Sequence, residues 1–108
     1  MIEINFYENH GRFSIVAKGH AEYAPHGQDI VCAAVTSICT ALGNFLENHE
    51  DECSYRVLNV TLEPGDIVVD AIEEEDFSYC MIKPLFNQAQ EFLEDLAVSY
   101  PANVKIVP

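Results

Sequence analysis

Apolar and polar residues alternate along residues 2–6 and again along residues 13–17, and a short polar segment at residues 9–11 separates the two. Alternation places every second side chain on the same face of a strand, so each segment predicts a β-strand with one buried face. The short separation predicts that the two strands form a hairpin. The pattern returns at residues 55–62 and 67–71 on either side of a Pro-Gly turn, which predicts a second strand pair.

In the middle of the chain the apolar residues change to steps of four and three. These positions are Val31, Val35, Ile38, Leu42 and Phe45. Such spacing places side chains on one face of a helix, and Asp29 stands where the helix N-cap is expected. A second helix is predicted over residues 85–100, with Pro84 in its first turn, and a short strand is predicted at residues 104–107.

The predicted order is therefore strand, strand, helix, strand, strand, helix, strand. Both helices bury their apolar faces if they cover one face of a largely antiparallel sheet, which predicts an α+β fold, a two-layer sandwich. A chain of 108 residues is long enough for one domain that buries roughly two thirds of the surface of the unfolded chain. We therefore expect residues 1–108 to form a single domain.

The charged residues are strongly unbalanced, with 18 Asp and Glu against 5 Lys and Arg and a net charge of −13. Nucleic acids and anionic membranes attract basic residues, so this balance argues against both as partners. It favours a basic partner, or it serves solubility alone. The sequence shows no secretory signal at its start and no uninterrupted apolar stretch of about eighteen residues, so we expect a cytoplasmic protein without a membrane helix.

The segment with the least regular pattern, residues 19–29, links the second predicted strand to the first predicted helix and contains Gly, Pro and Gly. Loops of this length often carry function. His20 stands at its start, and Cys32 is the third helical residue if Asp29 is the cap. The positive end of the helix dipole favours a thiolate there, and an imidazole nearby could act as its base and then as the acid for a leaving amine.

Spacing alone leaves two interpretations of Cys32 open. Free cysteine is among the most buried residue types, so Cys32 could be a core residue and not a nucleophile. Asp29 fits a helix cap better than a third catalytic member, and its negative charge opposes the helix dipole at a neighbouring thiol. We expect Cys39, Cys53 and Cys80 to be reduced thiols without a role, as is usual in the cytoplasm.

The histidines and cysteines also raise the question of a metal. His20, His26 and Cys32 could converge on zinc, but their spacing matches no structural zinc motif, and the chain has no Cys-x-x-Cys pair. His10 falls in the first predicted hairpin turn and His49 near the end of the first helix, where a cation suits the dipole. We therefore expect no metal and no cofactor.

The residues around His20 and Cys32 resemble the signature of a known family. Gly19-His20-Ala21, followed by Gly27-x-Asp29-Ile30-Val31-Cys32-Ala33-Ala34-Val35, is similar to the signature of the ribosomal-processing cysteine proteases, the Prp family. The resemblance covers nearly the whole chain, and the spacing of twelve residues between the histidine and the cysteine is fairly specific. Within it, residues 23–26 lie outside the motif, and Thr36 stands where a serine is common.

The resemblance implies a small homodimeric endopeptidase that removes an N-terminal extension from the twenty-seventh protein of the large ribosomal subunit, a basic precursor. It implies Cys32 as nucleophile, His20 as general base and Asp29 as an orienting acid. Residues 21–28 would then be a flap over the substrate. Family cleavage follows an aromatic residue. The substrate-binding positions carried over are Gly19, Ala21, Tyr23 and Gly27, with Tyr23 contributing to an apolar pocket.

Two other functions remain possible on the sequence. One is a non-catalytic, acidic ribosome-assembly factor that holds a basic ribosomal protein by charge. The other is a thiol-redox or metal-dependent protein. For the protease, the backbone N–H groups at the start of the first helix are the natural candidates to stabilise an oxyanion.

Overall fold

The computed structural model describes residues 1–25, 27–52, 54–74 and 82–108. Its elements are β1 (Ile2–Asn9), β2 (Arg12–Lys18), α1 (Ile30–His49), a short 3-10 helix η1 (Glu50–Glu52), β3 (Tyr55–Glu63), β4 (Asp66–Glu73), α2 (Ile82–Ser99) and β5 (Val104–Val107). The predicted order of five strands and two helices is confirmed. Three residues considered above, His26, Cys53 and Cys80, lie outside the described residues.

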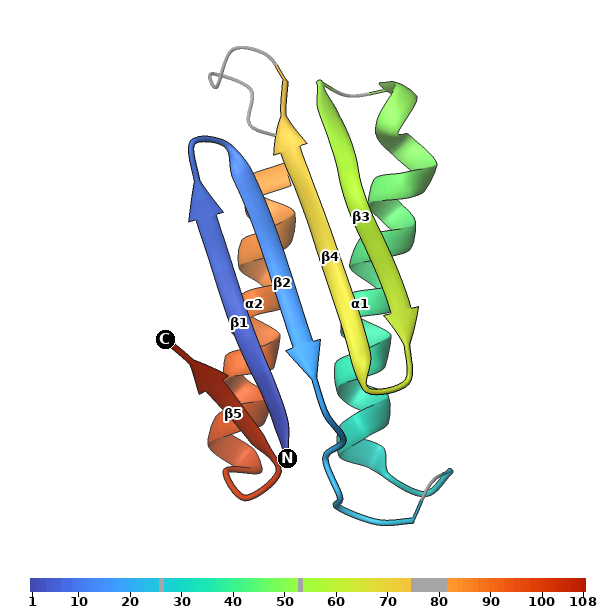
Figure 1. The fold of residues 1–108 in the computed structure, drawn as a ribbon, viewed down its shortest axis with the longest axis vertical. Helices are drawn as coiled ribbons and strands as arrows, with labels where there is room; N and C mark the ends of the chain where they lie inside the picture. The colour runs from blue at the N-terminus through green and yellow to red at the C-terminus, as the bar shows by residue number, and fades with distance from the viewer. Residues whose placement is uncertain (26, 53, 75–81) are drawn as a thin grey trace.

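The five strands form one sheet in the order β3-β4-β2-β1-β5. Neighbouring strands are antiparallel except β1 and β5, which are parallel. Figure 1 shows both helices on the same face of this sheet, so the predicted two-layer α+β sandwich is confirmed. The pairing of β3 with β4 shifts between Val57 and Asn59, a β-bulge that explains why the alternation in β3 changes phase in the sequence.

The core lies between the sheet and the two helices. Its fully or almost fully buried side chains include Ile4, Ile15 and Val69 from the sheet and Val31, Val35, Leu46 and Leu93 from the helices. Phe13 of β2 stacks on Phe86 of α2 with their ring centroids 5.6 Å apart. The alternating and helical patterns place these residues on the buried faces, except Leu46, which is buried where the pattern predicts Phe45.

Two aromatic residues of the predicted helical stripes are not buried. Phe45 is 43% exposed and Phe92 is 53% exposed. Both line a groove of about 430 Å³ between α1 and α2. The apolar face of each helix is therefore wider than the part that packs against the sheet, and the apolar residues at its edge are exposed to solvent.

Helix α1 is long enough and apolar enough to meet the criteria for a membrane span, which the sequence analysis did not anticipate. The apolar residues of α1 are explained by its packing, because Val31, Val35, Cys39 and Leu46 form one buried stripe. Helices in the core of a sheet–helix layer meet the same criteria. The helix is thus accounted for by its packing on the sheet.

Helix α2 begins with help from a buried carboxylate. Glu73, at the end of β4, is 7% exposed, and its Oε1 accepts a hydrogen bond from the backbone N–H of Ile82 at 3.1 Å. The first N–H groups of a helix lack partners within the helix, and this carboxylate satisfies one of them, as an N-cap side chain does. A residue at the end of β4 thereby stabilises the start of α2.

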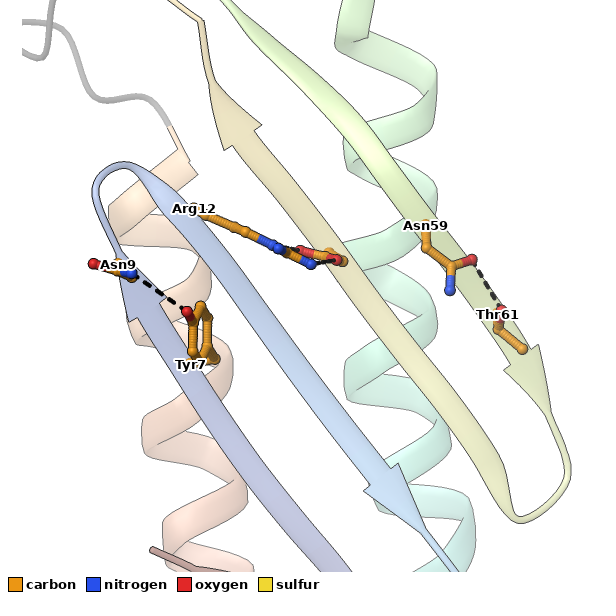
Figure 2. A network of polar contacts seen from close by, with 6 residues as sticks. Tyr7, Asn9, Arg12, Asn59 and Thr61 are labelled. Carbon is orange, nitrogen blue, oxygen red and sulfur yellow. Dashed lines mark hydrogen bonds and ion pairs between the residues drawn. The ribbon is translucent and has the colours of Figure 1, made fainter.

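The other face of the sheet carries a polar network, which Figure 2 shows from close by. Arg12 of β2 reaches to β4 and donates to both carboxylate oxygens of Asp70, at 3.1 and 2.7 Å. The hydrogen bond to Asp70 is the main reason that the pKa of Arg12 is raised above its usual value. The guanidinium also lies 5.9 Å from the ring centroid of Tyr7. This two-pronged pair ties the neighbouring strands β2 and β4 together.

Candidate active site

The chain leaves β2 in a narrow space beside the first residue of the protein. Gly19 has φ +96°, and a Cβ there would lie 2.4 Å from the carbonyl oxygen of Met1. The N–H of Gly19 donates to the carbonyl of Gly65 in the β3–β4 turn at 3.0 Å. Only glycine fits both the conformation and the space, so this residue sets the direction in which His20 leaves the sheet.

Cys32 is the third residue of α1, as the sequence predicts, because the helix begins at Ile30 with Asp29 as its N-cap. One carboxylate oxygen of Asp29 accepts the N–H of Cys32 at 2.9 Å, which confirms the cap. The other oxygen accepts the N–H of Tyr23 at 3.0 Å. Asp29 therefore ties the start of the loop to the start of the helix.

These bonds favour the ionised form of Asp29 and occupy helix N–H groups. The pKa of Asp29 is lowered from its usual 3.8, chiefly by the hydrogen bond from Cys32 N–H. The N–H of Ala33 donates to the carbonyl of Asp29 at 3.0 Å. The expectation that the helix start offers free donors to an oxyanion is therefore wrong for Cys32 and Ala33, whose N–H groups are already bonded.

A cavity of about 610 Å³ lies between the loop, α1 and the β3–β4 hairpin. Its lining residues are His20, Glu22, Ala24, Gly27, Asp29, Cys32, Ala33, Thr36, Ser37, Leu62 and Pro64. The structure thus brings His20, Asp29, Cys32 and Gly27 to one cavity, although His20 and Cys32 come from opposite ends of the loop. Cys32 is half-buried at this wall and is not a core residue like Cys39.

The histidine and the cysteine both line the cavity. Among the described residues, no hydrogen bond joins the imidazole of His20 to the thiol of Cys32. Contacts between catalytic groups are often long before substrate binds and close in the complex. The arrangement supplies a thiol at a helix N-terminus and an imidazole that line one cavity, which are the parts that nucleophilic catalysis needs.

Three of the predicted substrate-binding residues lie outside the lining of this cavity. Gly19 contacts Met1, as described above, and Ala21 is buried, with its carbonyl accepting a hydrogen bond from Asn103 Nδ2 at 2.9 Å. Tyr23 packs edge-on against Tyr100, with ring centroids 5.5 Å apart. These contacts fasten the first half of the loop to the end of α2. A role of these residues in substrate binding stays a prediction.

The contribution of the β3–β4 hairpin to the cavity is not apparent from the sequence. Leu62 and Pro64 form an apolar part of the cavity wall, which Ala33 and Thr36 of α1 also line. The Pro-Gly turn was visible in the sequence as a turn only. Its place beside His20 depends on β4 pairing with β2, where Lys18 lies opposite Asp66 and forms an ion pair with it.

The remaining thiols and imidazoles do not form a second centre within the described residues. Cys39 is fully buried, and burial raises the pKa of its thiol from 9.0 to about 11. His10 lies in the β1–β2 turn, and the ring of His49 packs on Phe45 with centroids 4.4 Å apart. In residues 1–25, 27–52, 54–74 and 82–108, no three side chains of His, Cys, Asp or Glu group as metal ligands would.

The model of one protein family, described as cysteine protease Prp, matches residues 1–105. The chain belongs to the Prp family of cysteine proteases. The resemblance based on residues 19–35 is thereby confirmed. A curated relative, the ribosomal processing cysteine protease Prp of Mycoplasma genitalium, is 53% identical over 38 residues, which are 35% of this chain. The matched chain spans about a third (34%) of that relative's length.

Solved structures of similar proteins confirm the fold of this Prp family member. An essential ribosomal processing protease Prp from S. aureus, in complex with a covalently linked product peptide, has a TM-score of 0.77 at 18% identity, covering 98% of this chain and 97% of that chain. A protein from Streptococcus mutans has a TM-score of 0.61 at 28% identity, covering 99% and 94%. Both similarities extend over the whole sandwich.

Proposed function

We propose that this chain is a cysteine endopeptidase in which Cys32 is the nucleophile and His20 is the general base. The observation that carries the proposal is the shared cavity, which Cys32 enters from the first turn of α1 and His20 from the end of β2. The membership of the chain in the Prp family supports the same chemistry. Asp29 acts as a positioning residue, because it bonds both the helix start and the loop.

The reaction proceeds through an acyl-enzyme. His20 accepts the thiol proton of Cys32, and the thiolate adds to the scissile carbonyl carbon. Collapse of the tetrahedral intermediate breaks the C–N bond as the imidazolium donates its proton to the departing amine. His20 then accepts a proton from water, whose oxygen attacks the thioester, and the second collapse releases the new carboxylate and returns the thiol. The oxyanion needs donors other than the N–H groups of Cys32 and Ala33 while these stay bonded to Asp29.

The substrate we propose is the basic precursor of a ribosomal protein, namely the twenty-seventh protein of the large subunit, from which the enzyme removes the N-terminal extension. Relatives described as ribosomal processing proteases support this class of substrate. The net charge of −13 suits a basic protein, since opposite charges steer association. The wall formed by Leu62 and Pro64 suits an apolar side chain beside the cleaved bond.

We propose a homodimer, as the family resemblance implies. We also propose that it works in the cytoplasm, where ribosomal precursors are made, without direct contact to nucleic acid or membrane. Sedimentation at several protein concentrations measures the assembly, and a monomer at all of them would contradict the dimer. Fractionation of cells that produce the protein measures its location.

The test of the catalytic assignment uses matched substitutions. We expect Cys32→Ala, Cys32→Ser and His20→Asn to abolish cleavage of a peptide that spans the extension, while far-UV and near-UV spectra stay unchanged. His10→Asn is the control, because it removes an imidazole from the turn at the opposite end of the sheet (Figure 1). Cleavage at the wild-type rate by either cysteine variant, or by His20→Asn, would refute the corresponding assignment.

The test of the substrate uses the full-length precursor. We expect wild-type protein to shorten it at one position, read from the mass of the new N-terminus. The alternative is a non-catalytic assembly factor, favoured by the acidic surplus alone. Such a factor would bind the precursor and leave its mass unchanged. Cleavage that stops when a metal chelator is added would instead support a metal-dependent protein.

A further inference from the structure

The tip of the His20 imidazole occupies the place where residue 65 would have a side chain. A Cβ built on Gly65 would lie 2.7 Å from Nε2 and 2.9 Å from Cε1 of His20. Real Cβ atoms essentially never approach another heavy atom within 3.0 Å. The ring therefore rests against the backbone of Gly65, and any other residue at this position would force the ring to move.

The β3–β4 turn, which contains Gly65, is hydrogen-bonded to the segment that follows β2 and leads to His20. The carbonyl of Gly65 accepts the N–H of Gly19 at 3.0 Å, so the two backbones are joined one residue before His20. On the next pair along the ladder, Lys18 of β2 forms an ion pair with Asp66 of β4. These contacts fix the position of the turn relative to the imidazole.

Turn geometry by itself gives a simpler reason for a glycine here. Gly65 has φ +74°, and a Pro-Gly pair with positive φ at the second position is typical of type II turns. That requirement is also met by asparagine, which enters the left-handed region more readily than other non-glycine residues. The approach of the imidazole is a separate constraint, because any Cβ at residue 65, including that of asparagine, would meet the ring in its present position and displace it.

The geometry points to Gly65 as a positioning residue for the reaction: the β3–β4 turn holds the His20 imidazole at the cavity wall. The inference rests on the proposed function, since it concerns the base of that reaction. Pro64 of the same turn lines the cavity, so the turn forms part of the wall and also supports the base. His20 thus depends on a residue 45 positions away in the sequence.

The expected effect of a Cβ at residue 65 is a misplaced base in an otherwise folded protein. A displacement of about 1 Å of a catalytic group can cost about 10²-fold in rate. We expect Gly65→Ala and Gly65→Asn to lower kcat by about 10²-fold, with KM little changed, because the other cavity residues stay in place.

The control for backbone strain is Gly11→Ala. Gly11 also has positive φ, at 82°, and lies in the β1–β2 turn at the far end of the sheet (Figure 1). We expect it to lower the melting temperature about as much as Gly65→Ala does and to leave kcat unchanged. Gly65→Asn guards against a loss of folding, because asparagine tolerates this φ and still brings a Cβ to the imidazole.

The deciding experiment is a double-mutant cycle on the alkylation rate of Cys32 with iodoacetamide, read by peptide mass. If residue 65 acts through His20, Gly65→Ala lowers this rate in wild-type background and has no further effect in His20→Asn background. An equal loss in both backgrounds would refute the inference, and so would wild-type kcat in both Gly65 variants. Wild-type cleavage by His20→Asn would instead refute the proposed function, so the two failures are distinguishable.

Discussion

Alkylation of the native protein separates its two described cysteines by their surroundings. Cys39 is 0% exposed, and burial raises the pKa of its thiol from 9.0 to about 11. Only the thiolate reacts. At about pH 8, a thiol with a pKa of 9.0 is roughly one tenth thiolate, and one with a pKa of about 11 is roughly one thousandth thiolate. Burial therefore suppresses the reactive form of Cys39 by about a hundredfold, before any loss of access for the reagent.

The assay treats native and urea-unfolded protein with iodoacetamide and follows each cysteine by the mass of its peptide. We expect native Cys39 to react at least about a hundredfold more slowly than unfolded Cys39. Cys32, which lines the cavity, should react in the native state. The loss of its free thiol should parallel the loss of cleavage activity. Peptide mapping keeps Cys53 and Cys80 apart from these two. Native Cys39 that reacts within tenfold of its unfolded rate would refute the reasoning.

Four further predictions concern the loop, the fold and the substrate. Asp29→Asn keeps an acceptor for the helix but loses the second carboxylate oxygen, so its melting temperature should stay near wild type while kcat/KM falls; wild-type kcat/KM would contradict this. Because the folded pKa of Asp29 is lowered, the stability that wild type has over Asp29→Ala should be present above pH 3.8 and be lost as the pH falls below it. Glu73→Ala should cost about 2 kcal/mol in urea unfolding by stranding the first N–H of α2, while the exposed neighbour Glu74→Ala should cost under about 0.5 kcal/mol; equal costs would contradict the cap. Added salt should slow cleavage of the whole precursor more than cleavage of a short neutral peptide, and equal slowing would leave the charge of −13 to solubility.

The parts of the structure that follow local rules could be predicted from the sequence. Alternation and helical spacing predict the seven elements, because each buries one face against the same core. The cap at Asp29 was also predictable, since it depends on residues three apart. The third helical position of Cys32 followed from that cap. The candidate nucleophile was thus placed by local physics before any fold was known.

Other parts depend on which strands pair, and no local pattern contains that information. The β3–β4 turn reaches His20 only because β4 inserts between β3 and β2 in the sheet. Tyr23 does not line the cavity, because its ring packs on that of Tyr100, which follows α2. Phe45 lies on the edge of a helical stripe, and spacing alone does not show how far around the helix the sheet extends.

Different contacts fix the two ends of the loop, residues 19–29. These contacts explain how residues from opposite ends of a long loop can line one cavity. At the cysteine end, Asp29 bonds the helix start and the N–H of Tyr23. At the histidine end, Gly65 bonds Gly19 and supports the imidazole. The positions of His20 and Cys32, the proposed base and nucleophile, are therefore set by the sheet and by α1 and not by the middle of the loop. Residues in the middle of the loop can then vary without moving these two side chains, whereas a change at either end would alter the proposed chemistry directly.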